Sequence, residues 1–189
     1  MERKTNIKRL VLTAVMIALA VVLSMVKIFK MPLGGSVTLL SMLPIALISV
    51  EYGIKWGLTA SFAYSLVQMG LDMAEVFSWG LSPLAIVGTI ALDYILAYSS
   101  IGISGIFRKK GVVGICIGIA IALTLRFIFH VISGTVIFAI WMPEEWNNPL
   151  LYSICYNGLY MLPELVFTMI GTVILFKLPQ FNKLISAKE

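Results

Sequence analysis

The chain alternates between long apolar runs and short gaps that are polar or contain glycine and proline. A helix needs roughly 20 predominantly apolar residues to cross a bilayer, and most of the runs approach or exceed this length. The pattern therefore predicts an all-α integral membrane protein with six transmembrane helices. We expect these helices over Leu10–Val26, Ser36–Val50, Trp56–Leu71, Ser82–Phe107, Val112–Trp141 and Leu150–Leu178.

The gaps between these runs carry loop and turn chemistry. Lys27–Gly35 is predicted to be a loop with its turn at Met31-Pro32-Leu33-Gly34-Gly35, and Glu51 and Lys55 mark a tight turn. A polar segment with Asp72, Glu75, Trp79 and Pro83 follows the third span, and Met142–Pro149 links the last two. Spans four to six are longer than a bilayer requires, which favours tilt or helical extension beyond the lipid.

Composition supports a membrane protein without a second domain. Of 189 residues, 60% are hydrophobic and 12% charged, and the mean hydropathy is +0.99. Soluble domains have about 45–50% apolar and about 25% charged residues. Six spans would use about 120 residues, which leaves no room for a nucleotide-binding domain. We expect residues 1–189 to form a single membrane domain, a six-helix bundle.

The basic residues predict the orientation of the chain. The net charge is +5, but the positive residues flank the spans and form no patch for nucleic acid, so we expect no nucleic-acid partner. With the N-terminus inside, eleven basic residues fall on the inner side and only Lys27 and Lys30 on the outer side. Positive residues favour the cytoplasmic side, so both termini are expected to be cytoplasmic. The inner residues are Arg3, Lys4, Lys8, Arg9, Lys55, Arg108, Lys109, Lys110, Lys177, Lys183 and Lys188.

Ionisable residues inside the membrane are costly and are therefore the first candidates for function. The expected spans contain Asp93, Arg126, His130 and Glu164. All lie toward the outer half of their spans, together with Tyr94 and a polar set in the last span. That set comprises Tyr152, Tyr156, Asn157 and Tyr160. The sequence therefore predicts a pocket that opens to the outside.

Each candidate also has a structural interpretation. Asp93 is either a ligand contact or the partner of Arg126 or His130, and His130 is either a ligand contact or a packing residue. Arg126 precedes His130 by four residues on the same helical face and is expected to hold the polar network. Glu164 follows Pro163 and serves either a break in the last span or the pocket. Tyr152 is either a pocket residue or part of an interfacial aromatic belt.

The first span carries a different signal. Ala14-Val-Met-Ile-Ala18 presents two small residues one turn apart, which lets another helix approach closely. Such a pair packs either within the chain or against a partner. The sequence shows no nucleophile motif, no phosphate-binding glycine loop and no multi-histidine metal site, so we expect no enzyme activity, cofactor or metal.

Several stretches together resemble a known family. They are Ala14–Ala18, Gly34-Gly-Ser-Val-Thr38 with Pro44, Gly57-Leu-Thr-Ala60, Leu92-Asp-Tyr94, Arg126-Phe-Ile-Phe-His-Val-Ile-Ser-Gly134 and Tyr152-Ser-Ile-Cys-Tyr-Asn157. The chain resembles, over its whole length, the substrate-binding (S) components of energy-coupling factor vitamin transporters, and most closely the thiamine-specific ones. The resemblance implies a bacterial plasma-membrane protein. It also implies a transmembrane coupling protein and two cytoplasmic ATPases as partners, besides membrane lipid.

The resemblance also implies roles for particular residues. The family's acidic ligand residue and its neighbouring tyrosine fall on Asp93 and Tyr94, and its histidine falls on His130. Its last-span tyrosine and asparagine fall on Tyr152 and Asn157. Two pocket tryptophans of some members fall on Gln68 and Phe138, so Phe138, Trp141 or an outer-loop residue is expected to stack on the ligand. Ala14 and Ala18 would dock the coupling protein.

The chemistry of thiamine agrees with this set. Its thiazolium is a permanent cation, which a buried carboxylate offsets and aromatic faces attract, and its aminopyrimidine offers donors and acceptors that Asn157 can meet. The expected function is therefore high-affinity thiamine binding for an ATP-driven importer. Two alternatives remain open: an S component for another vitamin or for the hydroxymethylpyrimidine precursor, and a stand-alone transporter that uses Asp93, Arg126 and His130 as a proton relay.

Overall fold

Long helices form where the apolar runs predict them. The computed structural model describes residues 2–32 and 34–181, and four of the six expected spans are continuous α-helices or end in one turn of 3₁₀ helix. These are α1 (Glu2–Met25), α3 (Ile54–Ser78), α6 (Gly111–Val136) with η3 (Phe138–Trp141), and α7 (Pro149–Lys177). Asn148 caps α7 by accepting hydrogen bonds from the amides of Leu150 and Leu151, at 2.9 and 3.1 Å, and Pro149 occupies the first helical position, where it costs no hydrogen bond.

The fourth span changes helix type along its length. It begins as α4 (Pro83–Thr89), continues as the π-helix η1 (Ile90–Leu96) and the short α5 (Ala97–Ser99), and ends as the 3₁₀ helix η2 (Ser100–Phe107). π-Helical turns are rare in proteins overall, and those that occur are frequently found at functional sites. Asp93 and Tyr94 both lie within η1.

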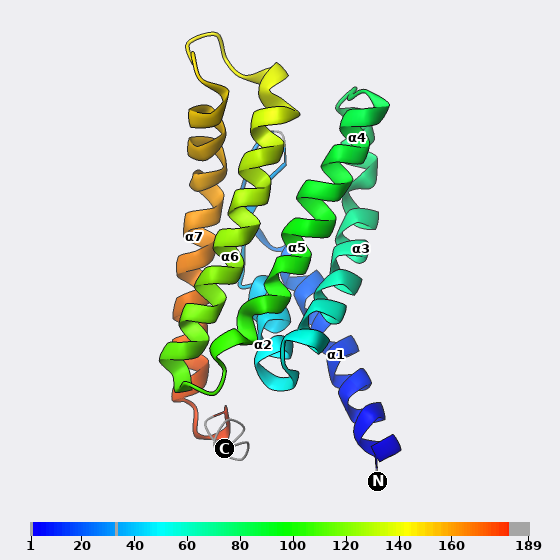
Figure 1. Ribbon diagram of the computed structural model, residues 1–189, viewed down its shortest axis with the longest axis vertical. Helices are drawn as coiled ribbons and strands as arrows, with labels where there is room; N and C mark the ends of the chain where they lie inside the picture. Colours follow the sequence, from blue (N-terminus) through cyan, green and yellow to red (C-terminus); the bar gives the residue numbers. More distant parts are fainter. Residues whose placement is uncertain (1, 33, 182–189) are drawn as a thin grey trace.

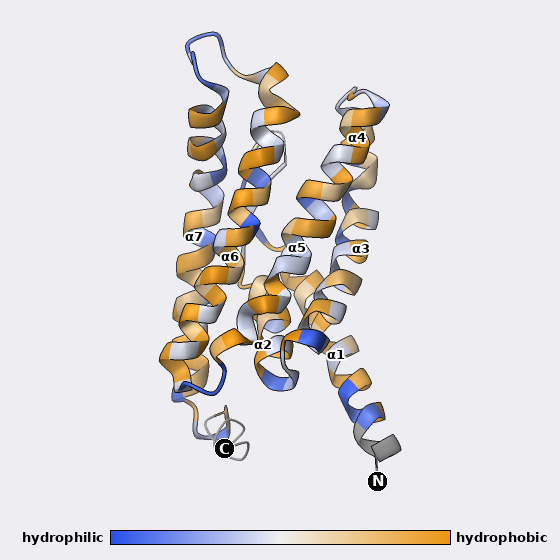
Figure 2. Ribbon diagram, viewed as in Figure 1, coloured by the Kyte–Doolittle hydropathy of each residue, from blue (hydrophilic) through white to orange (hydrophobic). Residues whose placement is uncertain are grey.

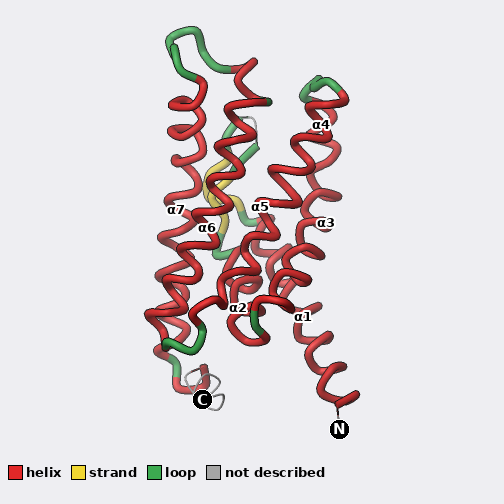
Figure 3. Tube along the Cα trace, viewed as in Figure 1, coloured by secondary structure: helices red, strands yellow, loops and turns green. Residues whose placement is uncertain are grey.

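The second span is shorter than the sequence predicts. Ser36–Thr38 is a strand, β2, which pairs antiparallel with β1 (Lys27–Lys30), and the helix α2 begins only at Met42 and ends at Tyr52. The expected loop over Lys27–Gly35 is therefore largely a β-hairpin, and the all-α prediction is corrected to a mostly helical fold with one small sheet (Figure 3). The 11 residues of α2 span about 16 Å, roughly half of the hydrocarbon core.

The third helix also departs from the prediction. Asp72 and Glu75, expected in a polar segment after the third span, lie on α3, which continues to Ser78. Among the described residues, four helices are long and apolar enough to cross a membrane by length and composition, namely Asn6–Met25, Pro83–Phe107, Gly111–Val136 and Pro149–Lys177. In Figure 2 most of the length of these helices is coloured as hydrophobic, and hydrophilic residues are concentrated in the connecting loops, with a few along the helices.

The two ends of the molecule differ in packing. At the end where α1 begins, helices α2, α3 and η2 cross at small residues: Ser49 Oγ donates to the carbonyl of Gly102 at 2.5 Å and accepts from the amide of Gly105 at 2.9 Å. This end also carries the basic loop Arg108–Lys110 and the last turn of α7 (Figure 1). Lys183 and Lys188, expected on the inner side, lie outside the described residues. At the opposite end, α6 and α7 separate from α3 and α4.

Candidate functional site

A cavity of about 520 Å³ lies between the two separated pairs of helices, with the β-hairpin along one side. Seven of the eight residues that the sequence singled out for substrate binding line it: Gln68, Asp93, Tyr94, His130, Phe138, Tyr152 and Asn157. Trp141 does not line the cavity. Its ring packs against that of Phe138, with centroids 5.6 Å apart. These seven residues lie up to 89 positions apart in the sequence, on helices from α3 to α7.

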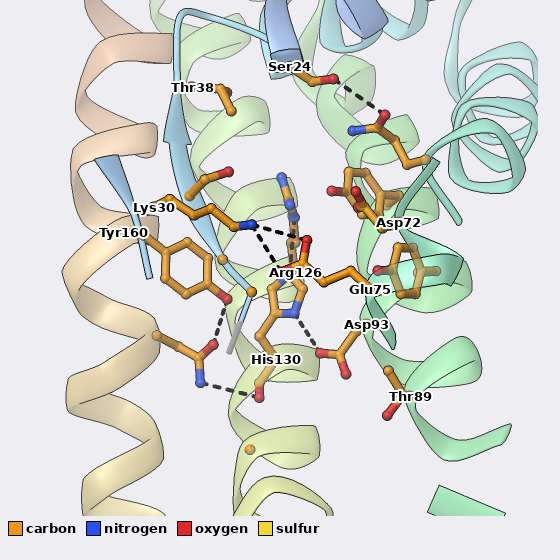
Figure 4. A pocket seen from close by; sticks show the side chains of 18 of the residues that line it. Ser24, Lys30, Thr38, Asp72, Glu75, Thr89, Asp93, Arg126, His130 and Tyr160 are labelled. Atoms are coloured by element: carbon orange, nitrogen blue, oxygen red, sulfur yellow. Dashed lines mark hydrogen bonds and ion pairs between the residues drawn. The ribbon is translucent and has the colours of Figure 1, made fainter. Parts of the chain in front are cut away.

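A connected polar network crosses the cavity wall from η1 to α6 (Figure 4). The Nδ1 of His130 lies 2.7 Å from Oδ1 of Asp93, and Ser133 Oγ donates a short hydrogen bond to Oδ2. On the other side of the imidazole, Arg126 Nε donates to His130 Nε2 at 3.2 Å. Arg126 and His130 are both buried. Asp93 is thus a partner of His130, as one of the two interpretations held, and it lines the cavity as well.

The Asp93 carboxylate is held in the cavity wall by its position in the π-helix η1 and by hydrogen bonds from α6. Asp93 is the acidic group of η1, and its two oxygens have separate donors on α6, from His130 and Ser133. In the described part of the chain, its only ion-pair partner is His130, which is charged only if protonated. The negative charge of Asp93 is therefore not offset by a directly contacting lysine or arginine.

Asn157 is held by neighbours on α6 and α7. Its Nδ2 donates to the carbonyl of Ser153 at 2.9 Å and to that of His130 at 3.3 Å, and its Oδ1 accepts from Tyr160 Oη at 2.6 Å. The two helices come this close because residue 134 is glycine: a Cβ there would collide with Ser153 Oγ.

Aromatic side chains follow the α7 side of the cavity. Tyr152, Tyr156 and Tyr160 succeed one another at one-turn intervals, with ring centroids 5.9 and 6.5 Å apart. Tyr156 Oη donates to the carbonyl of Gly34 in the hairpin turn at 3.2 Å, and Gly35, with φ +76°, lies against the ring of Tyr160 where a Cβ would have no space. Tyr156 and Tyr160 thus join the hairpin turn to α7, and Tyr152 extends the same row of rings along the cavity.

Residues that the sequence reasoning did not assign to the site complete the wall. Trp79, at the end of α3, lies edge-on to Phe138 with centroids 5.5 Å apart and next to Gly34. Lys30 of β1 and Glu75 of α3 form an ion pair with nitrogen–oxygen distances of 3.0 and 3.1 Å. Trp79 and Glu75 were visible in the sequence as a polar, aromatic segment, but no sequence signal pairs Lys30 with a residue 45 positions away.

Glu164 serves the fold outside the cavity. α7 continues through Pro163 without a break, so the suggested role at a helix break is wrong. The carboxylate instead accepts hydrogen bonds from the amide and the hydroxyl of Thr38, at 2.7 and 2.8 Å. It anchors strand β2 to α7.

The chemistry of the cavity suits a compact organic cation with hydrogen-bonding edges. The lining includes three carboxylates (Asp72, Glu75 and Asp93) and three basic residues (Lys27, Lys30 and Arg126). Of the carboxylates, Glu75 is paired with Lys30, whereas Asp93 has no cationic lysine or arginine in contact. Tyrosine, tryptophan and phenylalanine side chains line the same cavity, and aromatic faces attract cations more strongly when desolvated.

Comparisons with known proteins agree on one family. The sequence profile of the thiamine transporter protein family (Thia_YuaJ) matches residues 10–183. The chain is 36% identical over 191 residues to the thiamine transporter ThiT of Bacillus subtilis (strain 168), covering 93% of this chain and 94% of that protein. The fold is similar to the solved structure of ThiT from Listeria monocytogenes, with a TM-score of 0.77, 23% identity, and coverage of 96% of this chain and 98% of the other.

Proposed function

This chain belongs to the thiamine transporter protein family, and on that premise we propose that it binds thiamine with high affinity as the S component of an ATP-driven energy-coupling factor importer in a bacterial plasma membrane. The observation that carries the proposal is the Asp93 carboxylate. It lies in an aromatic-lined cavity of about 520 Å³ without a lysine or arginine in contact. A permanent cation such as thiazolium supplies the positive counter-charge that Asp93 lacks.

The proposed contact set consists of the seven cavity residues expected from the sequence, with Trp79 added. Trp79 and Phe138 present an edge-to-face aromatic pair, which suits stacking on a flat heterocycle. Asn157 and Tyr152 face the same space from α7. We leave Trp141 out because its ring contacts Phe138 and does not line the cavity.

The cavity is proposed to open to the outside. The basic loop Arg108–Lys110 and the start of α1 lie at the opposite end of the molecule from the Met142–Pro149 loop (Figure 1). Positive residues near span ends favour the cytoplasm, so the end with the cavity is the outer one and both termini are cytoplasmic.

The first helix offers an exposed surface on which a partner protein can pack. Ala14 and Ala18 are both exposed, and α1 has the smallest buried share of the four spanning helices. Small residues one turn apart allow close helix approach, and in the described part of the chain no other helix covers them. We propose that they contact the transmembrane coupling protein, with ATP hydrolysed by the two cytoplasmic ATPases.

Mass spectrometry of small molecules that co-purify with the detergent-solubilised chain tests the substrate. We expect thiamine, and we expect tighter binding in calorimetric titration for thiamine than for hydroxymethylpyrimidine. Recovery of a different vitamin, or a preference for the pyrimidine alone, contradicts the substrate.

The mode of energy coupling needs a separate experiment. Uptake in cells should require the coupling protein and the ATPases and should survive a protonophore for as long as ATP lasts. Uptake that stops with the protonophore and is indifferent to loss of the ATPases would instead indicate a proton-coupled transporter.

A further inference from the structure

His130 has both ring nitrogens engaged within the chain, and its two partners together decide where its proton lies. Arg126 Nε is 3.2 Å from Nε2. A guanidinium is protonated at all ordinary pH values and can only donate. Nε2 must therefore be the acceptor nitrogen. In the neutral ring the proton then lies on Nδ1, which donates to Oδ1 of Asp93 at 2.7 Å.

Arg126 is held in place by groups that are not acids. Its Nη1 donates to Met42 Sδ at 2.7 Å, and its guanidinium carbon lies 4.2 Å from the centroid of the Tyr98 ring. It precedes His130 by one helical turn on α6, so their side chains share one face. Among the described residues, no carboxylate forms an ion pair with Arg126. Its orientation therefore depends on the thioether and the aromatic face, and its Nε–H is left for the imidazole.

The orientation of Asp93 depends on this proton position. Oδ1 receives the Nδ1–H of His130, and Oδ2 receives the hydroxyl of Ser133. If the proton lay on Nε2 instead, Nδ1 would present a lone pair to a carboxylate oxygen at 2.7 Å. Two acceptors at that distance repel each other, and the carboxylate would have to turn away.

We propose that Arg126 is a positioning residue: by donating to Nε2 it orients the His130 ring in the Nδ1–H tautomer that Asp93 accepts, and thereby fixes the Asp93 carboxylate in the direction that receives the cationic part of the ligand. The ligand's identity rests on the proposed function, but the tautomer does not. In this arrangement neither ring nitrogen of His130 is free to hydrogen-bond the ligand, so His130 contacts the ligand through its ring face and orients Asp93 through Nδ1.

The chain contains a single histidine, so selective ¹⁵N-histidine labelling reports on His130 alone. In the full-length protein in detergent at neutral pH, we expect NMR to show a protonated, pyrrole-like Nδ1 and an unprotonated, pyridine-like Nε2. A protonated Nε2, whether in the opposite tautomer or in an imidazolium, overturns the proposal. This measurement needs no ligand, so it stands or fails separately from thiamine binding.

Two substitutions at Arg126 separate the hydrogen bond from the rest of the side chain. Gln places its amide nitrogen at the same bond position as Arg Nε, whereas Met places a methyl group there. Arg126→Gln should keep the Nδ1–H signature. Arg126→Met leaves Nε2 without a donor, so the pyridine-like ¹⁵N resonance of Nε2 should shift, and thiamine binding should weaken by roughly tenfold, as expected for losing a hydrogen bond that orients a charged group.

Arg108→Met is the matched control, since Arg108 lies in the loop at the other end and contacts the carbonyl of Glu51 at 3.1 Å. It should leave both the His130 spectrum and the thiamine affinity unchanged. An Arg126→Met protein with an unaltered Nε2 resonance or an unaltered thiamine affinity contradicts the proposal. If that variant does not fold, the wild-type and Arg126→Gln spectra decide.

Discussion

At the scale of single residues, substitution of Asp93 gives the most direct test of the proposed ligand. Asp93→Asn retains the shape but removes the charge, and its amide NH₂ must face a donor on either His130 or Ser133. Losing a charged partner in a desolvated site costs on the order of 2–5 kcal/mol. Thiamine affinity, measured by calorimetric titration, should therefore fall at least about tenfold.

Glu144→Gln removes one negative charge from the exposed loop outside the cavity and should leave the affinity as it was. Equal affinity of Asp93→Asn and the wild type would mean that Asp93 serves only the fold.

Thr89 gives a second residue-scale prediction. It is 1% exposed, its hydroxyl has no hydrogen-bond partner in the described chain, and it lines the cavity one turn before Asp93. Thr89→Val should weaken thiamine binding by about two- to tenfold, since a hydrogen bond contributes about 0.5–1.5 kcal/mol. It should not lower the thermal stability, because no protein hydrogen bond is lost.

Ser61 provides a matched comparison. Its hydroxyl is equally buried and equally without a partner, but it does not line the cavity. Ser61→Ala should leave thiamine binding unchanged. If the two variants bind alike, the Thr89 hydroxyl makes no contact with the ligand.

At the scale of elements, the hairpin β1–β2 is held by two carboxylates in very different surroundings. Glu164 is 2% exposed and accepts two hydrogen bonds from Thr38, whereas the side chains of Lys30 and Glu75 are 48% and 35% exposed. Breaking buried charged hydrogen bonds costs more than breaking an exposed pair, which contributes about 0–1 kcal/mol. Glu164→Gln should therefore lower the melting temperature clearly, and Glu75→Gln only slightly.

Hydrogen exchange locates the effect. In Glu164→Gln, amide protection should drop at Ser36–Thr38, because the Thr38 amide loses its acceptor or shares a weaker one. A larger loss of protection in Glu75→Gln would show that the ion pair, and not the buried carboxylate, fixes the hairpin.

At the scale of the whole molecule, the proposed division between binding and docking predicts separable functions. Ala14 and Ala18 lie on α1, away from the cavity, since neither lines it. Replacing both with Trp should leave thiamine binding by the isolated chain nearly intact. Co-purification with the coupling protein and ATP-dependent uptake should be lost, because bulky side chains hold the incoming helix away.

Leu162 and Val166 give the control: both are exposed apolar residues one turn apart on α7. Trp at these two positions should affect neither binding nor assembly. If the alanine double variant loses thiamine binding, the motif supports the fold; if it still assembles and transports, the docking surface lies elsewhere.

The sequence by itself determined the helices and the polar residues between them. The apolar runs place α1, α6 and α7 to within a few residues at most ends, and α3 more loosely, because crossing lipid requires long apolar segments whatever they pack against. Most of the candidate site was also accessible, since ionisable residues in apolar runs are few and costly. Seven of the eight expected binding residues line one cavity, although their contact with thiamine remains a prediction.

Only the tertiary structure decided how those residues meet. Strand β2 of the hairpin is anchored by hydrogen bonds from Thr38 to Glu164, 126 positions away. Trp79 lines the cavity, whereas Trp141 does not. The four-residue spacing predicted that Arg126 and His130 share a helical face, with Asp93 as a possible partner, but the π-helical turn at Asp93 and the partner of each atom in the chain of hydrogen bonds were not readable from it. Hydropathy reports how each segment meets lipid, which is a local property. Pairing, helix type and side-chain direction depend on neighbours that are distant in the sequence, and these become defined only when the helices pack.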